Sequence, residues 1–105
     1  MEYSVEITET CLEEIDGICE YIEKKLIAEQ SSSRLRAQIR EKIKNLPSSP
    51  RMYAESDKKD REGRKYRKIL IDNYVILYSI LEEDNVILIS HMYYNRQNYM
   101  DGGLL

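Results

Sequence analysis

The sequence predicts an α+β fold whose elements follow the order β-α-α-β-β-β. Three observations predict it: an apolar–polar alternation over residues 3–7, two helical periodicities before residue 47, and three β-rich segments after residue 64. Consecutive strands joined by short turns form antiparallel hairpins. We therefore expect an antiparallel sheet with an N-terminal α-hairpin packed on one of its faces.

The first strand is predicted by three large residues that alternate with polar ones: Tyr3, Val5 and Ile7. A helix from about residue 10 to 28 follows, because large apolar residues recur at steps of three and four: Leu12, Ile15, Ile18, Ile22 and Leu26. Thr10, three residues before Glu13, is typical of a capping box at the helix start. Gly17 inside this segment slightly lowers the stability of the helix, and its lack of a side chain would permit the close approach of a neighbouring element.

A second helix is predicted to begin at the three serines of residues 31–33, which would cap it, and to stop at Pro47. Its apolar stripe recurs with helical spacing: Leu35, Ile39, Ile43 and Leu46. A short break between two helices indicates an antiparallel hairpin. The following residues 51–64 are polar and have no period, which predicts a loop.

The remaining chain has the composition of strands. Residues 65–71, 74–81 and 86–92 are rich in β-branched and aromatic side chains, and residues 93–99 continue the last strand or form an edge piece. Asp72-Asn73 suits a two-residue hairpin turn, and the polar residues 82–85 suit the next turn. No linker or repeat interrupts the sequence, so residues 1–105 are expected to form one domain.

Length and composition exclude several classes of protein. The chain has 105 residues, one histidine and two cysteines, too few for a histidine-rich or cysteine-rich metal site. Cys11 and Cys19 would lie about 12 Å apart along one helix, beyond disulfide reach, which favours buried, reduced thiols. The start has no signal-peptide pattern, and no apolar run approaches a bilayer span. We therefore expect a cytoplasmic protein without membrane contact, cofactor or metal.

Charge is distributed unevenly along the chain. Residues 1–29 hold nine acids and two lysines, whereas residues 58–68 hold seven bases. The basic segment suits contact with phosphates or with an acidic partner, and it equally suits a solvated loop that enters an exposed strand. An acidic first helix would repel nucleic acid, so a phosphate-binding face would have to lie elsewhere.

The most unusual local composition lies at residues 91–99, which combine three tyrosines, one histidine, one arginine and three carboxamides. If the strand persists to Arg96, Tyr94 and Arg96 share one face while Tyr93 lies on the other. These side chains are compatible with three roles. They could contact phosphates and stack on nucleic-acid bases, they could form a hot spot for binding a protein, or they could cover one end of the hydrophobic core. His91 suits a packed strand residue or a proton-transfer group.

Several segments together resemble the RelE/ParE superfamily, the toxins of bacterial type II toxin–antitoxin systems. The resemblance covers nearly the whole chain and depends on the order and spacing of five pieces: the strand and acidic helix through residue 22, IKNLP at 43–47 with Pro50 shortly after, YRKIL at 66–70, NYVILY at 73–78 and RQNY at 96–99. It implies a growth-inhibiting, plasmid-stabilising toxin domain that a cognate antitoxin protein neutralises.

The resemblance favours the ParE-like branch, whose members inhibit DNA gyrase and lack the catalytic set of RelE-like ribonucleases. Val75 stands where RelE-like enzymes usually carry a phosphate-binding arginine, and Ile69 stands at a second usually basic position. A valine cannot stabilise the charge of a pentavalent phosphate. A homodimer of the protein is a further alternative when no antitoxin is present.

The alternative is a RelE-like, metal-independent endoribonuclease that cuts mRNA on the ribosome. In that case the resemblance implies a catalytic set of Arg67, Lys68, Tyr94, Arg96 and Tyr99. A third alternative is a diverged, inactive member that binds only its antitoxin. In each case we expect basic side chains to form the binding surface: Arg61, Arg64, Lys65, Arg67 and Arg96. Arg67 and the segment 94–99 are expected to border one shared concavity.

Overall fold

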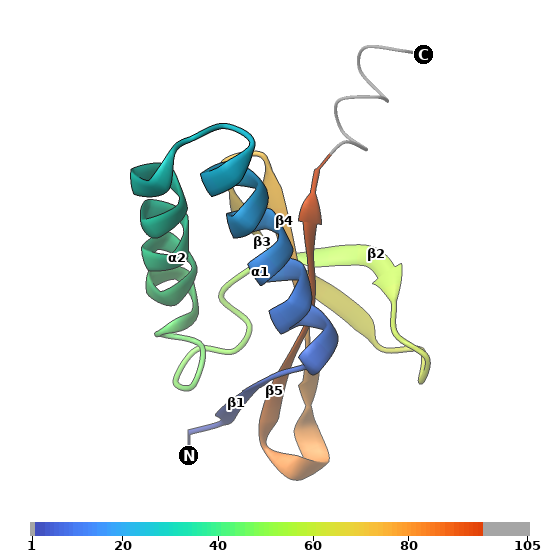
Figure 1. Cartoon of the computed structure of the whole chain (residues 1–105). Coiled ribbons are helices and arrows are strands. Elements are labelled where there is room, and N and C mark those ends of the chain that lie inside the picture. Colours follow the sequence, from blue (N-terminus) through green and yellow to red (C-terminus); the bar gives the residue numbers. More distant parts are fainter. Residues whose placement is uncertain (1, 96–105) are drawn as a thin grey trace.

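The computed structural model describes residues 2–95 of the chain. The elements are β1 (Ser4–Ile7), α1 (Glu9–Lys24), α2 (Glu29–Ile43), β2 (Glu55–Lys59), β3 (Lys65–Ile71), β4 (Tyr74–Leu81), a short 3-10 turn (Glu82–Asp84) and β5 (Val86–Tyr94). The strands form one sheet in the order β1-β5-β4-β3-β2. Both helices lie on the same side of that sheet (Figure 1). The predicted α+β class and element order are confirmed.

The sheet is antiparallel from β2 to β5, as the hairpin turns predict. At its other edge β1 runs parallel to β5, with Ser4 opposite Val86 and Ile7 opposite Ile89. A parallel pair needs a long connection, and here the α-hairpin and three strands lie between the two partners. The sheet is therefore mixed, a detail that the expectation of an antiparallel sheet did not include.

The start of α1 is fixed by Thr8. Its Oγ1 accepts a hydrogen bond from the backbone N–H of Cys11 at 3.1 Å and donates one to the carbonyl of Ser90 at 3.2 Å. The predicted cap at Thr10 is wrong, because a threonine two residues earlier satisfies the helix end and also ties it to β5. The helix ends at Lys24, and Ile27 in the connection to α2 has a positive φ of 49°.

The start of α2 lacks the predicted serine cap. The helix begins at Glu29 after Ala28, which makes no side-chain capping bond. Ser32 instead lies inside the helix, 1% exposed, and its hydroxyl donates to a carboxylate oxygen of Glu23 on α1 at 2.8 Å. The serine cap is wrong because this hydroxyl joins the two helices rather than closing the end of one.

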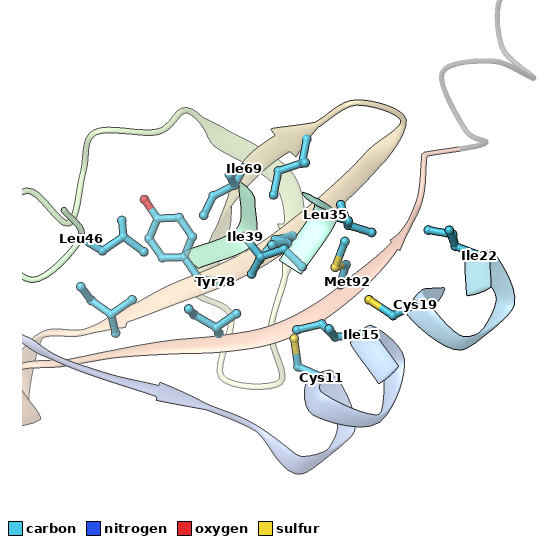
Figure 2. Close-up of a cluster of buried hydrophobic side chains, with 14 residues drawn as sticks. Cys11, Ile15, Cys19, Ile22, Leu35, Ile39, Leu46, Ile69, Tyr78 and Met92 are labelled. Atoms are coloured by element: carbon cyan, nitrogen blue, oxygen red, sulfur yellow. The ribbon is translucent and has the colours of Figure 1, made fainter. Parts of the chain in front are cut away.

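The core lies between the helices and the sheet (Figure 2). The helix α1 contributes Cys11, Ile15, Cys19 and Ile22, so the two cysteines occupy the buried stripe while Leu12 is 48% exposed. Both thiols are free, and burial raises the pKa of the Cys11 thiol to about 11. The cysteines therefore behave as small buried hydrophobic residues, as expected.

One strand of the sheet was not predicted from the sequence. Residues 51–64 were expected to form a loop, but Glu55–Lys59 is the edge strand β2, with Glu55 opposite Arg67 and Lys59 opposite Lys65. Its charged, mostly exposed residues show no period because an edge strand has one neighbour and here covers little of the core. Charged edge strands of this kind resist pairing with other chains.

Candidate functional site

Arg67 faces the loop that precedes β2 rather than open solvent. Its Nη1 donates to the carbonyl of Tyr53 at 2.7 Å and to that of Arg51 at 3.4 Å, and its Nη2 lies 3.6 Å from a carboxylate oxygen of Glu55. Only 18% of the side chain is exposed. A guanidinium engaged in this way has few donors left for a phosphate, so its observed role is to hold the loop.

Tyr78 supports the same loop from β4, where it lies directly opposite Arg67. The side chain is fully buried, its hydroxyl donates to the carbonyl of Pro50 at 2.7 Å, and its ring contacts that of Tyr53 edge to face with centroids 6.4 Å apart. Burial raises the pKa of Tyr78 to about 12. Tyr53 in turn donates to the carbonyl of Lys42 at 2.7 Å, which ties the loop to the end of α2.

The sheet face away from the helices, called the open face below, carries a second group of side chains. Strand alternation places Tyr66 and Lys68 there, one residue to either side of Arg67. The ring of Tyr66 meets the ring of His91 edge to face at 6.1 Å, and Lys58 Nζ lies 4.8 Å from the ring centroid of Tyr93. Lys68 and Arg67 thus project to opposite faces of the sheet.

Val75 lies on the open face and is 4% exposed, opposite Tyr93 in the β4–β5 ladder. Its position offers an apolar, covered surface with no hydrogen-bond donor. Next to it along the chain, Tyr74 faces the helices and packs edge to face on Tyr94, with ring centroids 5.7 Å apart.

Tyr94 belongs to a groove between α1 and the end of the sheet, called the α1 groove below. This groove has a volume of about 650 Å³ and is mainly apolar; its walls include Gly17, Ile18, Tyr21, Leu26, Met92 and Tyr94. Tyr21, Leu26 and Tyr94 are each about half exposed, at 56%, 58% and 47%. Leu26 was expected to continue the apolar stripe of a helix reaching about residue 28, but α1 ends at Lys24, so Leu26 lies beyond the helix and lines the groove.

The structure does not bring Arg67 and Tyr94 together. Arg67 lies opposite Tyr78 and Tyr94 lies opposite Tyr74, four residues apart along β4, with core side chains between them. The expected shared concavity is therefore wrong for this pair. The other two residues of the proposed catalytic set, Arg96 and Tyr99, lie outside the described residues.

The remaining basic residues lie around the tip of the β2–β3 hairpin. Arg64 pairs with Asp60 at 2.7 Å and with Glu62 at 3.3 Å, so its charge is compensated within the turn. Lys65 is exposed at the start of β3. Arg61 is exposed, and no other residue within 2–95 is its hydrogen-bond or ion-pair partner. Among the members of the predicted binding set that lie within residues 2–95, Arg61 and Lys65 are thus the ones whose side chains face solvent with no partner in that range.

A smaller polar cavity of about 280 Å³ separates this hairpin tip from β5 and the start of α1. His91 lines it; its Nδ1 lies 3.5 Å from a carboxylate oxygen of Glu14, which also accepts the backbone N–H of Met92 at 3.0 Å. The buried hydroxyl of Ser79 also borders the cavity and has no hydrogen-bond partner in the described chain.

Within residues 2–95 no group of three or more potential ligands could hold a metal ion, and neither helix is long and apolar enough to cross a membrane.

This fold is that of small toxins from type II toxin–antitoxin systems. A chain of the chromosomal ParDE system of P. aeruginosa shares 15% identity at a TM-score of 0.69, covering 89% of this chain and 96% of its own. The isolated E. coli toxin RelE shares 17% identity at a TM-score of 0.62, covering 98% and 99%. A chain of the intact E. coli RelBE complex shares 20% identity at a TM-score of 0.60, covering 88% and 95%. At these identities the similarity shows the fold alone.

Sequence comparison defines the family. Residues 5–99 match the family model described as the ParE toxin of the type II toxin–antitoxin system parDE, and the chain belongs to that family. No curated protein matches the sequence. The predicted membership of the RelE/ParE superfamily, and with it the assignment as a type II toxin, is confirmed.

Proposed function

We propose that this toxin acts in the cytoplasm as a ParE-like inhibitor of DNA gyrase and that a cognate antitoxin protein neutralises it. The match of residues 5–99 to the ParE toxin family carries the proposal. Solved structures with the same fold include the ParDE system of P. aeruginosa and the RelBE complex of E. coli, which supports a partner of the antitoxin kind.

The geometry around Arg67 supports the non-enzymatic branch. Cleavage of a phosphodiester requires donors that are already directed at the reacting phosphate. Arg67 directs its donors at the carbonyls of Tyr53 and Arg51 instead, and Val75 places a covered methyl-bearing side chain on the open face.

A RelE-like ribonuclease is the second candidate, and the open face favours it. Lys58, Tyr66, Lys68 and His91 bring cationic and proton-exchanging groups to one surface, and the fold is shared with E. coli RelE. Such an enzyme would hold a phosphate with its bases and move a proton through a tyrosine or His91. A diverged member that binds only an antitoxin is the third candidate.

The test is a supercoiling assay with purified toxin, gyrase, ATP and relaxed plasmid. We expect supercoiling to be lost as the toxin reaches a modest molar excess over gyrase, while relaxation by topoisomerase I under the same conditions is unaffected. In parallel, mRNA on programmed ribosomes should stay intact. Intact supercoiling with cut mRNA would establish the ribonuclease instead, and neither effect, with antitoxin binding retained, would establish the diverged member.

A further inference from the structure

A buried hydroxyl without a partner borders the cavity of about 280 Å³ between the β2–β3 hairpin tip and the start of α1, called the polar cavity below. Ser79 points away from the core, because its neighbour Tyr78 points into the core and side chains alternate along a strand. Ser79 is 1% exposed, and its Oγ has no hydrogen-bond partner within residues 2–95. An unpaired buried hydroxyl is costly, so a partner from outside the chain is expected in this cavity.

The start of α1 contributes further hydrogen-bond donors to the polar cavity. Thr8 and Thr10 line it. The N–H groups of Cys11 and Leu12 are bonded to Thr8, whereas those of Glu9 and Thr10 have no acceptor in the part of the chain that the structure describes. Free N–H groups at the start of a helix, together with the helix dipole, attract anions.

The hairpin tip adds a positive charge. Arg61 lines the polar cavity and has no hydrogen-bond or ion-pair partner within residues 2–95. The two acids that line it are engaged elsewhere. Asp60 accepts the N–H of Glu62 at 3.0 Å and the Nε of Arg64 at 2.7 Å, and the carboxylate of Glu62 lies 3.3 Å from Arg64. The charge of Arg61 is therefore not compensated in the described chain.

His91 completes the lining from β5. Its Nδ1 lies 3.5 Å from a carboxylate oxygen of Glu14, and its ring meets that of Tyr66 edge to face. Nε2 is then the ring nitrogen without a partner in residues 2–95. The polar cavity thus brings several donors together with few uncommitted acceptors, which is the composition of an anion site.

We propose that the polar cavity binds a single phosphate group, held by Arg61, the hydroxyl of Ser79 and the free N–H groups at the start of α1. Phosphate oxygens are strong acceptors and match a lining of donors. A volume of about 280 Å³ suits one phosphate group rather than a length of nucleic acid. Free phosphate and a nucleoside 5′-monophosphate present the same chemistry. The inference depends neither on gyrase nor on the antitoxin.

The test titrates the free, full-length toxin with inorganic phosphate at constant ionic strength, by calorimetry and by NMR of the backbone amides. We expect saturable binding that shifts the amide of Thr10. Ser79→Ala and Arg61→Gln should each raise the Kd by about 10-fold or more, the loss expected for a hydrogen bond to a charged group. Lys65→Gln removes an exposed cation from the same hairpin and should leave the Kd within about twofold.

Two further probes distinguish the source of the phosphate group. Tighter binding of adenosine 5′-monophosphate than of inorganic phosphate would identify a nucleotide as the ligand, and equal binding would identify free phosphate; both results uphold the inference. A dinucleotide with only an internal phosphodiester should bind more weakly than either. Were it to bind most tightly, the surface would contact a nucleic-acid chain, as the ribonuclease candidate requires, and the inference would be wrong.

Three other outcomes would overturn the inference. Absence of saturable phosphate binding would leave the hydroxyl of Ser79 to ordered water. An unchanged Kd in Ser79→Ala would place the phosphate outside the polar cavity. Equal losses in Lys65→Gln and Arg61→Gln would mean that the charge of the whole hairpin attracts phosphate without a defined site. Removal of the Ser79 hydroxyl breaks no bond of the described chain, so the variant remains folded and each result can be interpreted.

Discussion

Arg67 on β3 holds the carbonyl of Tyr53 at 2.7 Å, across 14 positions of sequence. The bond connects the basic strand, which a ribonuclease would use for its substrate, to a loop that packs on α2 and β4. In this chain the arginine is thus a part of the scaffold.

Replacing Arg67 with alanine should destabilise the fold. We expect the free energy of unfolding in urea to fall by about 1.5–3 kcal/mol, because the variant leaves loop carbonyls without their charged donor. Lys68→Ala removes an exposed cation from the next position and should change stability by less than about 0.5 kcal/mol. Equal stabilities of the two variants, with toxicity lost only in Arg67→Ala, would show instead that Arg67 acts on the target.

Two equally buried serines should respond oppositely to alanine. Ser32 donates to Glu23 at 2.8 Å, whereas Ser79 has no partner within the described residues, and each is 1% exposed. Ser32→Ala should lower the free energy of unfolding by about 1 kcal/mol, while Ser79→Ala should leave it unchanged or raise it by up to about 1 kcal/mol. Urea denaturation of both variants checks the pair; a larger loss at Ser79 would contradict it.

Stability should decline in alkali as the phenol of Tyr78 ionises. Burial raises its pKa from 10.0 to about 12, so the unfolded chain loses this proton at a lower pH than the folded chain does. The contribution is complete below pH 10 and is lost as pH rises through about 12, with a total of up to roughly 3 kcal/mol. The buried Cys11 thiol, whose pKa is about 11, acts in the same direction from pH 9.

The Tyr78→Phe variant separates these contributions. It should be less stable at neutral pH, because the carbonyl of Pro50 loses its donor, yet its stability should fall less steeply between pH 10 and 12. Unfolding measured by circular dichroism over this range suffices, and an unchanged slope in Tyr78→Phe would refute the assignment.

Much of the fold could be predicted from local sequence patterns. The strands at 65–71 and 74–81 match β3 and β4 to the residue, because their β-branched residues are continuous and their turn is short. The predicted helix caps were wrong because contacts between elements decide what each hydroxyl does. Thr8 caps α1 and also bonds to Ser90 on β5, whereas Ser32 lies inside α2 and bonds to Glu23 on α1.

The candidate site was harder to predict from the sequence than the fold was. The anchoring of Arg67 depends on a loop without periodicity, so no local pattern signalled it. The α1 groove joins α1 to the ends of β4 and β5, and its residues carry no motif. Gly17 was the one signal in the sequence that pointed to this surface, and it indicated a close approach without naming the approaching element.

The most direct test of the central claim is made in one culture in which the toxin is induced without its antitoxin. Plasmid topoisomers and the integrity of several mRNAs are measured from the same samples over the first minutes. The account predicts loss of negative supercoiling together with growth arrest, while the mRNAs stay full length. Rapid cutting of mRNA at codon-spaced positions, with the topoisomer distribution unchanged, would contradict it.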